Sequence, residues 1–387
     1  MRSAFGADQA APNDADDDEV AMTQPAPETL DTLSSEPAPA AQPEDRKSPD
    51  GKSIEGKSPL QIAMGRLVRD KIAMLCLAVV LIFVLLAILA GVISDFFGVS
   101  TDPVLPSRYL DPLSGGLPKK GPPLNGYDPE HPFGIAPATA DDNLAYWLFG
   151  ARTSLSIAGM STLLSMVIGI TVGLVAGYAG GVVDKTISFV TDLFLTIPFL
   201  LAALSVSPIL AERFADNPDR YATVKFWALV IILTMFGWMG VARLIRGEVL
   251  SLREREFVQA ARVLGMPTPR ILAKELLPNL VAPIVVSASL MLPLNVAAEA
   301  GLAYLGIGVD GASWGQTILK ATNFFQTYPL YLWEPLIGVV LLVLALNLLG
   351  DAIRDALDPR DPSLTGPMNV AQPRTGGVRK QERLDKA

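Results

Sequence analysis

The segment GKSIEGKS, Gly51–Ser58, matches the G-x4-G-K-S pattern of a phosphate-binding loop letter for letter. Such a loop binds ATP when a strand leads into it and a helix leaves it, because backbone N–H groups then surround the phosphates. Here the preceding residues, PAAQPEDRKSPD, cannot form a buried strand, and Pro59 follows directly. No apolar strand ending in aspartate lies nearby to hold magnesium. We interpret the match as a coincidence and predict that this chain neither hydrolyses ATP nor holds a cofactor of its own.

Histidine and cysteine each occur once, as His131 and Cys76. A single histidine excludes a multi-histidine metal site, and a single cysteine excludes an intrachain disulfide. We therefore predict no metal site, and no residue stands out as catalytic.

Four polar side chains lie inside long apolar runs, namely Asp192, Asn295, Glu299 and Asn347. Such residues are candidate functional groups, because burying them in lipid is costly. Asp192 and Glu299 lie near the ends of their runs, where we expect water to reach them. Asn295, Glu299 and Asn347 are our candidates for a translocation path. No series of carboxylates indicates a proton- or sodium-coupled transporter, and no filter-like loop indicates a channel.

The composition is that of a membrane protein with an acidic tail. Hydrophobic residues make up 50% of the chain and the mean hydropathy is +0.37, both high for a soluble protein. Residues 1–58 are rich in Ala, Pro, Asp, Glu and Ser, and we predict a disordered cytoplasmic tail there, without the features of a signal peptide. Residues 363–387 are predicted as a flexible cytoplasmic tail. We expect contact with the lipid bilayer and no nucleic-acid partner.

Apolar runs of about 20 residues predict membrane-spanning helices, since a helix of that length crosses the hydrocarbon core. We predict an all-α membrane protein with six such helices in a domain covering residues 59–362. Prolines interrupt the third and fifth runs, and neighbouring helices can satisfy the freed carbonyls. The predicted spans are residues 72–94, 154–178, 189–210, 225–245, 279–301 and 333–350.

Lysine and arginine predict the orientation, because loops rich in them stay in the cytoplasm. They precede the first span, fill the loop 246–278 and follow the sixth span, whereas the loop 302–332 holds only Lys320. Both termini and the loop 246–278 are thus predicted to be cytoplasmic. Residues 95–153, 211–224 and 302–332 are predicted to lie outside. The sequence DDNLAYWLFGA, at the end of the first of these, predicts a short amphipathic helix on the membrane surface.

The second span carries a stripe of small residues at every fourth position. Such a stripe lets another helix approach closely. It fits packing within the chain or packing against a partner subunit, and the sequence does not separate the two. Its members are Ser161, Ser165, Gly169, Gly173, Gly177 and Gly181.

The loop 246–278 reads as two short helices joined by a bend. In LREREFVQAARVLG, one helical face carries Phe257, Ala260, Ala261 and Leu264. Gly265 is predicted to end this helix, since glycine readily takes the left-handed conformation required there. Both alanines are predicted to be exposed and to leave room for another protein.

The second short helix is predicted to begin with Thr268 as its N-cap and Pro269 as its first residue. Pro267 prevents the first helix from continuing, and Pro278 is predicted to end the second. A solvated connector without any partner is the alternative interpretation of this loop.

At these residues the sequence resembles the EAA coupling motif of binding-protein-dependent ABC import permeases: E-A-A, three residues, G, nine residues, then I-x-L-P. The alanines correspond to Ala260 and Ala261, the glycine to Gly265, and the final pair to Leu277 and Pro278. Two positions depart from the motif, with Gln259 in place of the glutamate and a glutamate in place of the isoleucine.

Further segments resemble the C-type permeases of dipeptide and oligopeptide importers, and the resemblance covers about residues 66–361. They are Asn347–Arg360 (NLLGDAIRDALDPR), Leu302–Gly315 (LAYLGIGV followed by SWG) and Gly150–Gly159 (GARTSLSIAG). After HPFG, ending at Gly134, that family usually continues T-D-x-x-G-R-D, whereas this chain continues IAPATADDN.

The resemblance implies a type I ABC importer permease in the bacterial cytoplasmic membrane. Its implied partners are a homologous B-type permease, two cytoplasmic ATPases that hold ATP and magnesium, and an external peptide-binding protein. It implies import of dipeptides or oligopeptides by alternating access, with Gln259–Pro278 as the coupling loop. Nickel chelates, glutathione or glycosides are alternative cargoes of similar permeases. A secondary transporter or channel is the alternative from another class.

Overall fold

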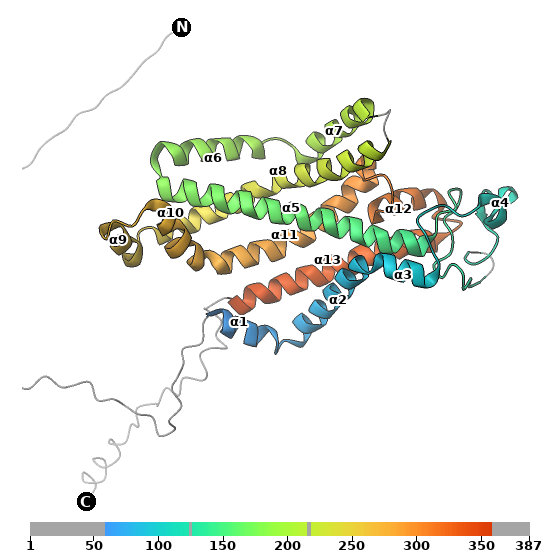
Figure 1. The fold of residues 1–387 in the computed structure, drawn as a ribbon, viewed down its shortest axis with the longest axis horizontal. Helices are drawn as coiled ribbons and strands as arrows, with labels where there is room; N and C mark the ends of the chain where they lie inside the picture. The colour runs from blue at the N-terminus through green and yellow to red at the C-terminus, as the bar shows by residue number, and fades with distance from the viewer. Residues whose placement is uncertain (1–58, 124–125, 215–217, 358–387) are drawn as a thin grey trace, which may run out of the picture. The chain divides into compact units, whose positions relative to one another are not determined.

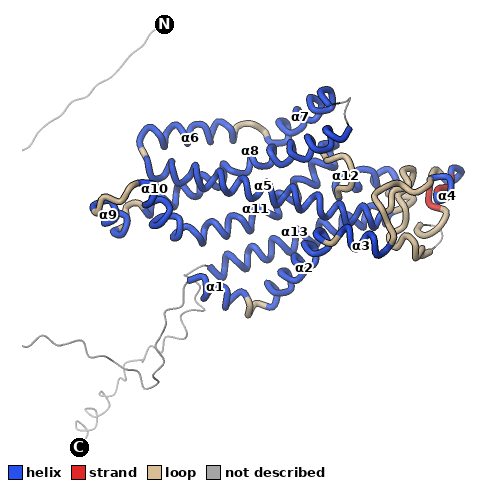
Figure 2. Tube along the Cα trace, viewed as in Figure 1, coloured by secondary structure: helices blue, strands red, loops and turns tan. Residues whose placement is uncertain are grey.

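The computed structural model describes residues 59–123, 126–214 and 218–357 (Figure 1). Outside these ranges lie the phosphate-loop match, both predicted tails and, of the predicted membrane domain, residues 124–125, 215–217 and 358–362. Within the described residues the protein is mostly helical, as Figure 2 shows.

Five described helices are long and apolar enough to cross a membrane. They are α2 (Lys71–Ile88), α5 (Asn143–Ala179), α8 (Pro218–Leu252), α11 (Val281–Leu302) and α13 (Pro329–Leu357). The third predicted span, residues 189–210, is a bent pair, α6 (Gly181–Leu195) and α7 (Phe199–Phe214), with an angle of 72° at the break. Counting this pair as one span, the prediction of six spans in an all-α protein is confirmed.

The break between α6 and α7 follows from Pro198, which lies directly before α7. Proline offers no backbone N–H, and its ring disfavours helical conformation in the residue before it, so α6 ends at Leu195. Pro208 and Pro293, by contrast, lie inside continuous helices, α7 and α11.

Shorter elements lie between the spans. Before α5 come α1 (Pro59–Leu67), α3 (Ala90–Phe97), α4 (Pro106–Tyr109) and the antiparallel strands β1 (Leu110–Asp111) and β2 (Leu117–Pro118), with a 3-10 turn at Pro112–Ser114. After α8 come α9 (Glu256–Val263), α10 (Thr268–Ile271) and, beyond α11, α12 (Trp314–Ala321) and a 3-10 turn at Thr322–Phe324. Figure 2 shows that loops gather around α9 and α10 and, at the opposite ends of the long helices, around α4 and α12.

The second span begins earlier than predicted. DDNLAYWLFGA is not a separate surface helix, because α5 starts at Asn143 and runs without a break through this segment. The Asp142 carboxylate accepts a hydrogen bond from the Ala145 N–H at 2.9 Å and caps the helix. Leu144 and Leu148 are buried in a cluster with Val99, and this packing extends α5 beyond the predicted membrane region.

The stripe of small residues on α5 is filled by α8. A Cβ atom on Gly173 would lie 2.7 Å from the Ala242 carbonyl oxygen and 2.8 Å from the Ile245 Cβ. Gly169 and Gly177 are blocked in the same manner by α8. Of the two interpretations, packing within the chain is confirmed. Gly181, however, does not belong to the stripe, because it is the first residue of α6.

Candidate functional site

The loop after the fourth span begins where α8 ends, at Leu252, seven residues beyond the predicted end of that span. After a turn, α9 covers Glu256–Val263. The chain then bends at Gly265, whose φ is +74°. The Gly265 N–H donates to the Arg262 carbonyl at 2.9 Å, and the Met266 N–H donates to the Ala261 carbonyl at 3.0 Å. These two bonds form a Schellman motif, so the predicted role of Gly265 at this bend is confirmed.

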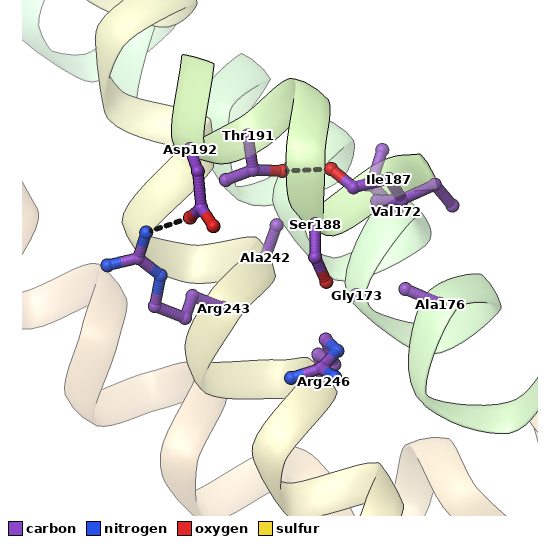
Figure 3. Close-up of a pocket in the computed structure, with 10 residues that line it drawn as sticks. All are labelled: Val172, Gly173, Ala176, Ile187, Ser188, Thr191, Asp192, Ala242, Arg243 and Arg246. Carbon is purple, nitrogen blue, oxygen red and sulfur yellow. Dashed lines mark hydrogen bonds and ion pairs between the residues drawn. The ribbon is translucent and has the colours of Figure 1, made fainter. Parts of the chain in front are cut away.

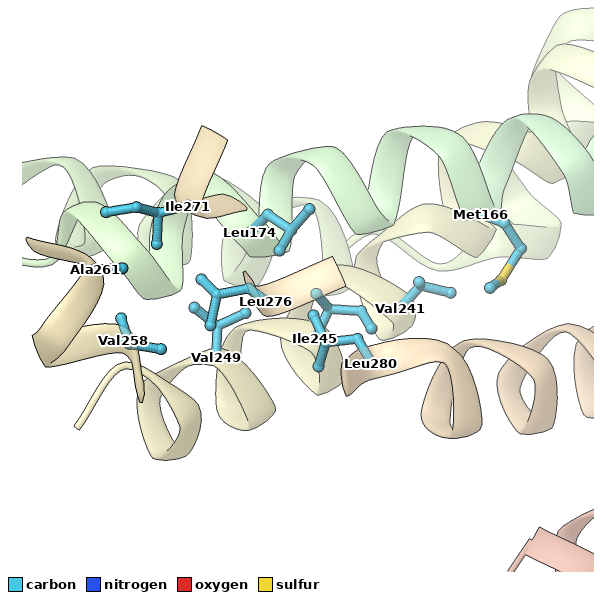
Figure 4. Close-up of a cluster of buried hydrophobic side chains, with 10 residues drawn as sticks. All are labelled: Met166, Leu174, Val241, Ile245, Val249, Val258, Ala261, Ile271, Leu276 and Leu280. Atoms are coloured by element: carbon cyan, nitrogen blue, oxygen red, sulfur yellow. The ribbon is translucent and has the colours of Figure 1, made fainter. Parts of the chain in front are cut away.

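One face of α9 is anchored in the core. Val258 is fully buried and Ala261 is 5% exposed, and both belong to a cluster with Val249, Ile271 and Leu276 (Figure 4). The prediction that Ala261 is exposed is therefore wrong. The reason is that α9 turns its Val258–Ala261 edge, and not its other apolar edge, toward α8 and α10.

The opposite edge of α9 is apolar and open. Val263 is 87% exposed and Leu264 is 83% exposed, and Phe257 and Ala260 are also exposed. Isolated exposed apolar side chains are ordinary, but a group of them on one helix end indicates a surface for another protein. We call Phe257, Ala260, Val263 and Leu264 the outer face of α9.

The second short helix differs from the prediction at both ends. Its N-cap is Pro267, and Thr268 is the first helical residue, without a side-chain capping bond. Pro278 does not end it, because the helical path continues through a π turn (Leu272–Leu276) and a 3-10 turn (Leu277–Leu280) into α11. The widened π turn accommodates the proline, whose ring would clash with a carbonyl in a regular α-helix.

Three side-chain bonds hold α9 against the ends of α5 and α8. The Gln259 amide donates to the Arg253 carbonyl at 3.2 Å. The Arg253 guanidinium donates to the Gly177 carbonyl at 3.1 Å, and Arg262 donates to the Tyr178 hydroxyl at 3.2 Å while lying 4.8 Å from the centre of its ring. Sequence reasoning missed Tyr178 and Arg253. A tyrosine at the end of an apolar run, facing a basic loop, was the available signal.

The translocation-path candidates have different surroundings. Asn295 is 5% exposed and donates to the Thr162 hydroxyl at 2.9 Å. Glu299, one turn further along α11, is completely buried and accepts a hydrogen bond from the Ser313 hydroxyl at 3.0 Å. No part of Glu299 is exposed in this conformation, contrary to the expectation that water reaches it. Asn347 is exposed on α13 and is not brought together with the other two.

Asn295 also lines a cleft of about 450 Å³ at the break between α6 and α7. The cleft is mostly apolar, with Pro198, Phe199 and Phe236 among its walls. Its position at a discontinuous span resembles the arrangement in which membrane transporters place substrate sites.

The end opposite α9 is organised by the HPFG segment. The His131 Nδ1 atom lies 2.6 Å from the Asp142 carboxylate, and both side chains are buried. This hydrogen bond is the main cause that raises the pKa of His131 above its ordinary value. Gly134 has a φ of +77°, and an added Cβ would collide with the Tyr328 hydroxyl. The segment is thereby fixed to the start of α5.

The divergent sequence after Gly134 forms a tight loop. Ala138 and Ala140 both have a φ of +61°, which is uncommon for residues with a side chain. Lys320, on α12, lies 3.2 Å from the Asp141 carboxylate and ties this loop to α12. The loop after Gly134 is therefore held to α12 at the end of the long helices opposite α9 (Figure 2).

Comparisons with known proteins agree with these features. Residues 169–360 match the family described as binding-protein-dependent transport system inner membrane component, and residues 58–112 match the N-terminal TM domain of oligopeptide transport permease C. The chain is 32% identical over 327 residues to the dipeptide transport system permease protein DppC of Alkalihalophilus pseudofirmus, covering 83% of this chain and 97% of that protein.

It is 36% identical over 229 residues to the oligopeptide transport system permease protein OppC of Mycobacterium tuberculosis, covering 59% of this chain and 75% of that protein. A chain of the MetNI methionine ABC transporter in inward-facing conformations aligns with a TM-score of 0.44 at 20% identity, covering 55% of this chain and 96% of that chain, a likeness too weak to carry an argument. Because the match to DppC spans nearly that whole protein, this chain belongs to the family of binding-protein-dependent transport system inner membrane components, as a multi-pass permease subunit of a bacterial plasma-membrane ABC importer.

Proposed function

We propose that this chain forms half of the membrane pore of an importer that moves dipeptides or oligopeptides into the cytoplasm at the expense of ATP. The observation that carries the proposal is the outer face of α9, which is apolar, exposed and joined rigidly to the membrane helices. The peptide cargo follows the relatives, which are named dipeptide and oligopeptide transport permeases.

The proposal assigns the outer face of α9 to a cytoplasmic ATPase. Ala260 is small and exposed there, so another protein can approach the helix closely, and the exposed Leu264 side chain can insert between residues of that protein. Ala261 and Gln259 would act from the inner side, by seating α9 on the core and on the turn after α8. Gly265 would set the bend that presents this face.

Motion of an ATPase would reach the spans by two routes. The first passes through Arg262 and Arg253 to the end of α5. The second passes through α10 and the π turn into α11, because Leu277 and Pro278 lie in one continuous helical path with it. A rigid-body displacement of α9 would thus shift α5 and α11 together, as alternating access requires.

The remaining partners and the orientation belong to the same proposal. Two ATPases would hydrolyse ATP, a homologous B-type permease would supply the other half of the pore, and an external binding protein would deliver the peptide. The α9 end would face the cytoplasm, following the arginines of the loop 246–278. The Asn295 cleft would lie on the path, with Glu299 as a buried neighbour and Asn347 further away.

The proposal predicts ATP-driven peptide accumulation in liposomes that contain the full complex of two permeases, two ATPases and the binding protein. A labelled dipeptide should accumulate with ATP and not with a non-hydrolysable analogue. The Lys57→Ala variant should transport normally, since we interpret its phosphate-loop match as a coincidence. Uptake driven by a proton or sodium gradient without ATP would contradict the proposal, and accumulation of a nickel chelate, glutathione or a glycoside in place of peptide would change the cargo.

A further inference from the structure

A polar stripe runs along α6 and faces two arginines of α8. Asp184, Ser188 and Asp192 follow one another at intervals of four residues, so they lie on one side of the helix. Asp192 lies 2.6 Å from the Arg243 guanidinium, and Figure 3 shows this pair among the side chains that line a pocket. Asp184 accepts two hydrogen bonds from Arg246, one of them at 2.8 Å.

A cleft of about 140 Å³ is lined by Ser188 and Asp192 of α6 and by Arg243 and Arg246 of α8. Gly173 and Ala176 of α5 line the cleft as well (Figure 3). The cleft is therefore a built concavity between three helices and not a chance contact of two surface side chains.

The two ion pairs differ in their exposure. The Asp184 side chain is 14% exposed and accepts hydrogen bonds from two nitrogens of Arg246, Nε and Nη2, which makes a strong and well-oriented pair. The Asp192 side chain is 66% exposed and that of Arg243 is 58% exposed, and they share one direct bond. The pair of Asp184 and Arg246 thus suits a fixed structural role, whereas the pair of Asp192 and Arg243 is open to exchange its partners.

This open pair cannot face lipid at low cost. A charged side chain within a membrane is expensive, and an exposed ion pair recovers only a small part of that expense. The pair lies one turn before the end of α6, beside the break that opens into the Asn295 cleft. Water or substrate on this side of α6 would satisfy both charges.

We propose that this cleft is a binding site for the charged ends of a peptide on its way through the pore. The Arg243 guanidinium would bind a terminal carboxylate, and the Asp192 carboxylate would bind a terminal ammonium group, after their mutual bond opens. A site with one charge of each sign is complementary to a zwitterion, because an anion or a cation alone would leave one member unpaired. The inference rests on the proposed function, since it takes peptides as the cargo.

Cysteine accessibility tests whether the cleft is wet. Cys76 is the sole cysteine of the chain, so a Cys76→Ala background allows single labels. In the reconstituted complex, Ser188→Cys should react with a charged, membrane-impermeant thiol reagent in at least one nucleotide state, and a transported dipeptide should slow the reaction. Phe189→Cys is the matched control. Phe189 is an exposed apolar residue on another side of α6, where we expect lipid, and a thiol in lipid does not ionise, so this cysteine should stay unreactive. An unreactive Ser188→Cys in both the resting and the vanadate-trapped states would overturn the inference, as would reaction unaffected by peptide.

A second experiment tests the role of Arg243 by changing the peptide. Arg243→Gln should lower uptake of a dipeptide with a free carboxylate by about tenfold, the size expected for a lost charge-assisted hydrogen bond, and should affect its C-terminal amide little. The ratio of variant to unmodified complex, taken for each peptide, removes the selectivity of the binding protein. Lys185→Gln removes a neighbouring exposed cation on α6 and should lower neither uptake.

The possible results separate this inference from the proposed function. An equal loss of uptake for the dipeptide and its amide in Arg243→Gln would overturn the binding of a terminal carboxylate by Arg243, without contradicting peptide import as the function. An unmodified complex that takes up no peptide at all would instead contradict the proposed function, and with it the peptide ligand of this cleft.

Discussion

Replacing Gly265 by valine is expected to reduce peptide uptake by about tenfold or more while the chain still enters the membrane in normal amount. The reason is conformational, because the Gly265 φ of +74° lies in the left-handed region, which costs a residue with a side chain about 1–2 kcal/mol and a β-branched one more. No atom lies within 4 Å of an added Cβ, so no clash contributes. The strain would be relieved by unwinding the end of α9, which displaces Leu264 and the outer face.

Transport of a labelled dipeptide, together with recovery of the ATPases on the purified membrane subunits, measures this effect. Gly247→Val is the matched control, since Gly247 lies within α8, has no positive φ and has open space around its Cβ position. We expect it to retain uptake. Full uptake and full ATPase recovery in Gly265→Val would show that the bend does not present the coupling surface.

Replacing Gly173 by valine is expected to destabilise the packing of α5 on α8 and to remove most of the folded chain from the membrane. The new Cβ would lie 2.7 Å from the Ala242 carbonyl oxygen, a backbone atom that cannot turn aside as a side chain can. Overpacking of this kind costs about 1–3 kcal/mol, and the further methyl groups of valine add to it. A loss of that size changes the abundance of a protein severalfold.

The measurement is the amount of detergent-solubilised chain that elutes as a single species, followed by its thermal unfolding. Gly159→Val is the control from the same helix, because no atom lies within 4 Å of an added Cβ there. It should elute and unfold like the unmodified chain. Equal behaviour of Gly173→Val and Gly159→Val would show that close approach to α8 is not what keeps Gly173 small.

The membrane spans could be predicted because their signal is local. A run of about 20 apolar residues can satisfy its own backbone hydrogen bonds in lipid by forming a helix, so composition located all six spans. The ends of the helices depended on contacts with distant residues. Asp142 caps α5, and Leu144 and Leu148 pack against the region after the first span, which turned a predicted surface helix into the start of a long one. Pro198 marked the break between α6 and α7 in the sequence, whereas the angle of 72° required the structure.

In the coupling loop, backbone chemistry was predictable and the choice of buried face was not. Gly265 ends α9 for reasons present in the residue itself. The helix carries two apolar edges, however, one through Val258 and Ala261 and one through Phe257 and Leu264. Which edge turns inward is decided by Val249, Ile271 and Leu276, which belong to other elements. The passage of helical structure through Pro278 was missed because a π turn absorbs the proline, and no simple pattern predicts that turn.

The burial of Glu299 has a similar origin. Its position near the end of a span favoured contact with water, but Ser313, from the segment before α12, donates a hydrogen bond to it and closes the site. Arg243 and Asp192 show the reverse case, since two residues 51 positions apart meet only because α6 folds back along α8. Their pairing required the structure, although the four-residue spacing along α6 was present in the sequence.

The most direct test of the account is to ask what the outer face of α9 touches. In the Cys76→Ala background, a photoreactive thiol reagent on Leu264→Cys should cross-link this chain to an ATPase subunit in the assembled complex. Leu113→Cys, which is 97% exposed in the segment between α4 and β2, should give no such product. ATPase adducts from Leu264→Cys alone are the predicted result, and their absence from Leu264→Cys, or equal adducts from both positions, would contradict the assignment of α9 as the coupling surface.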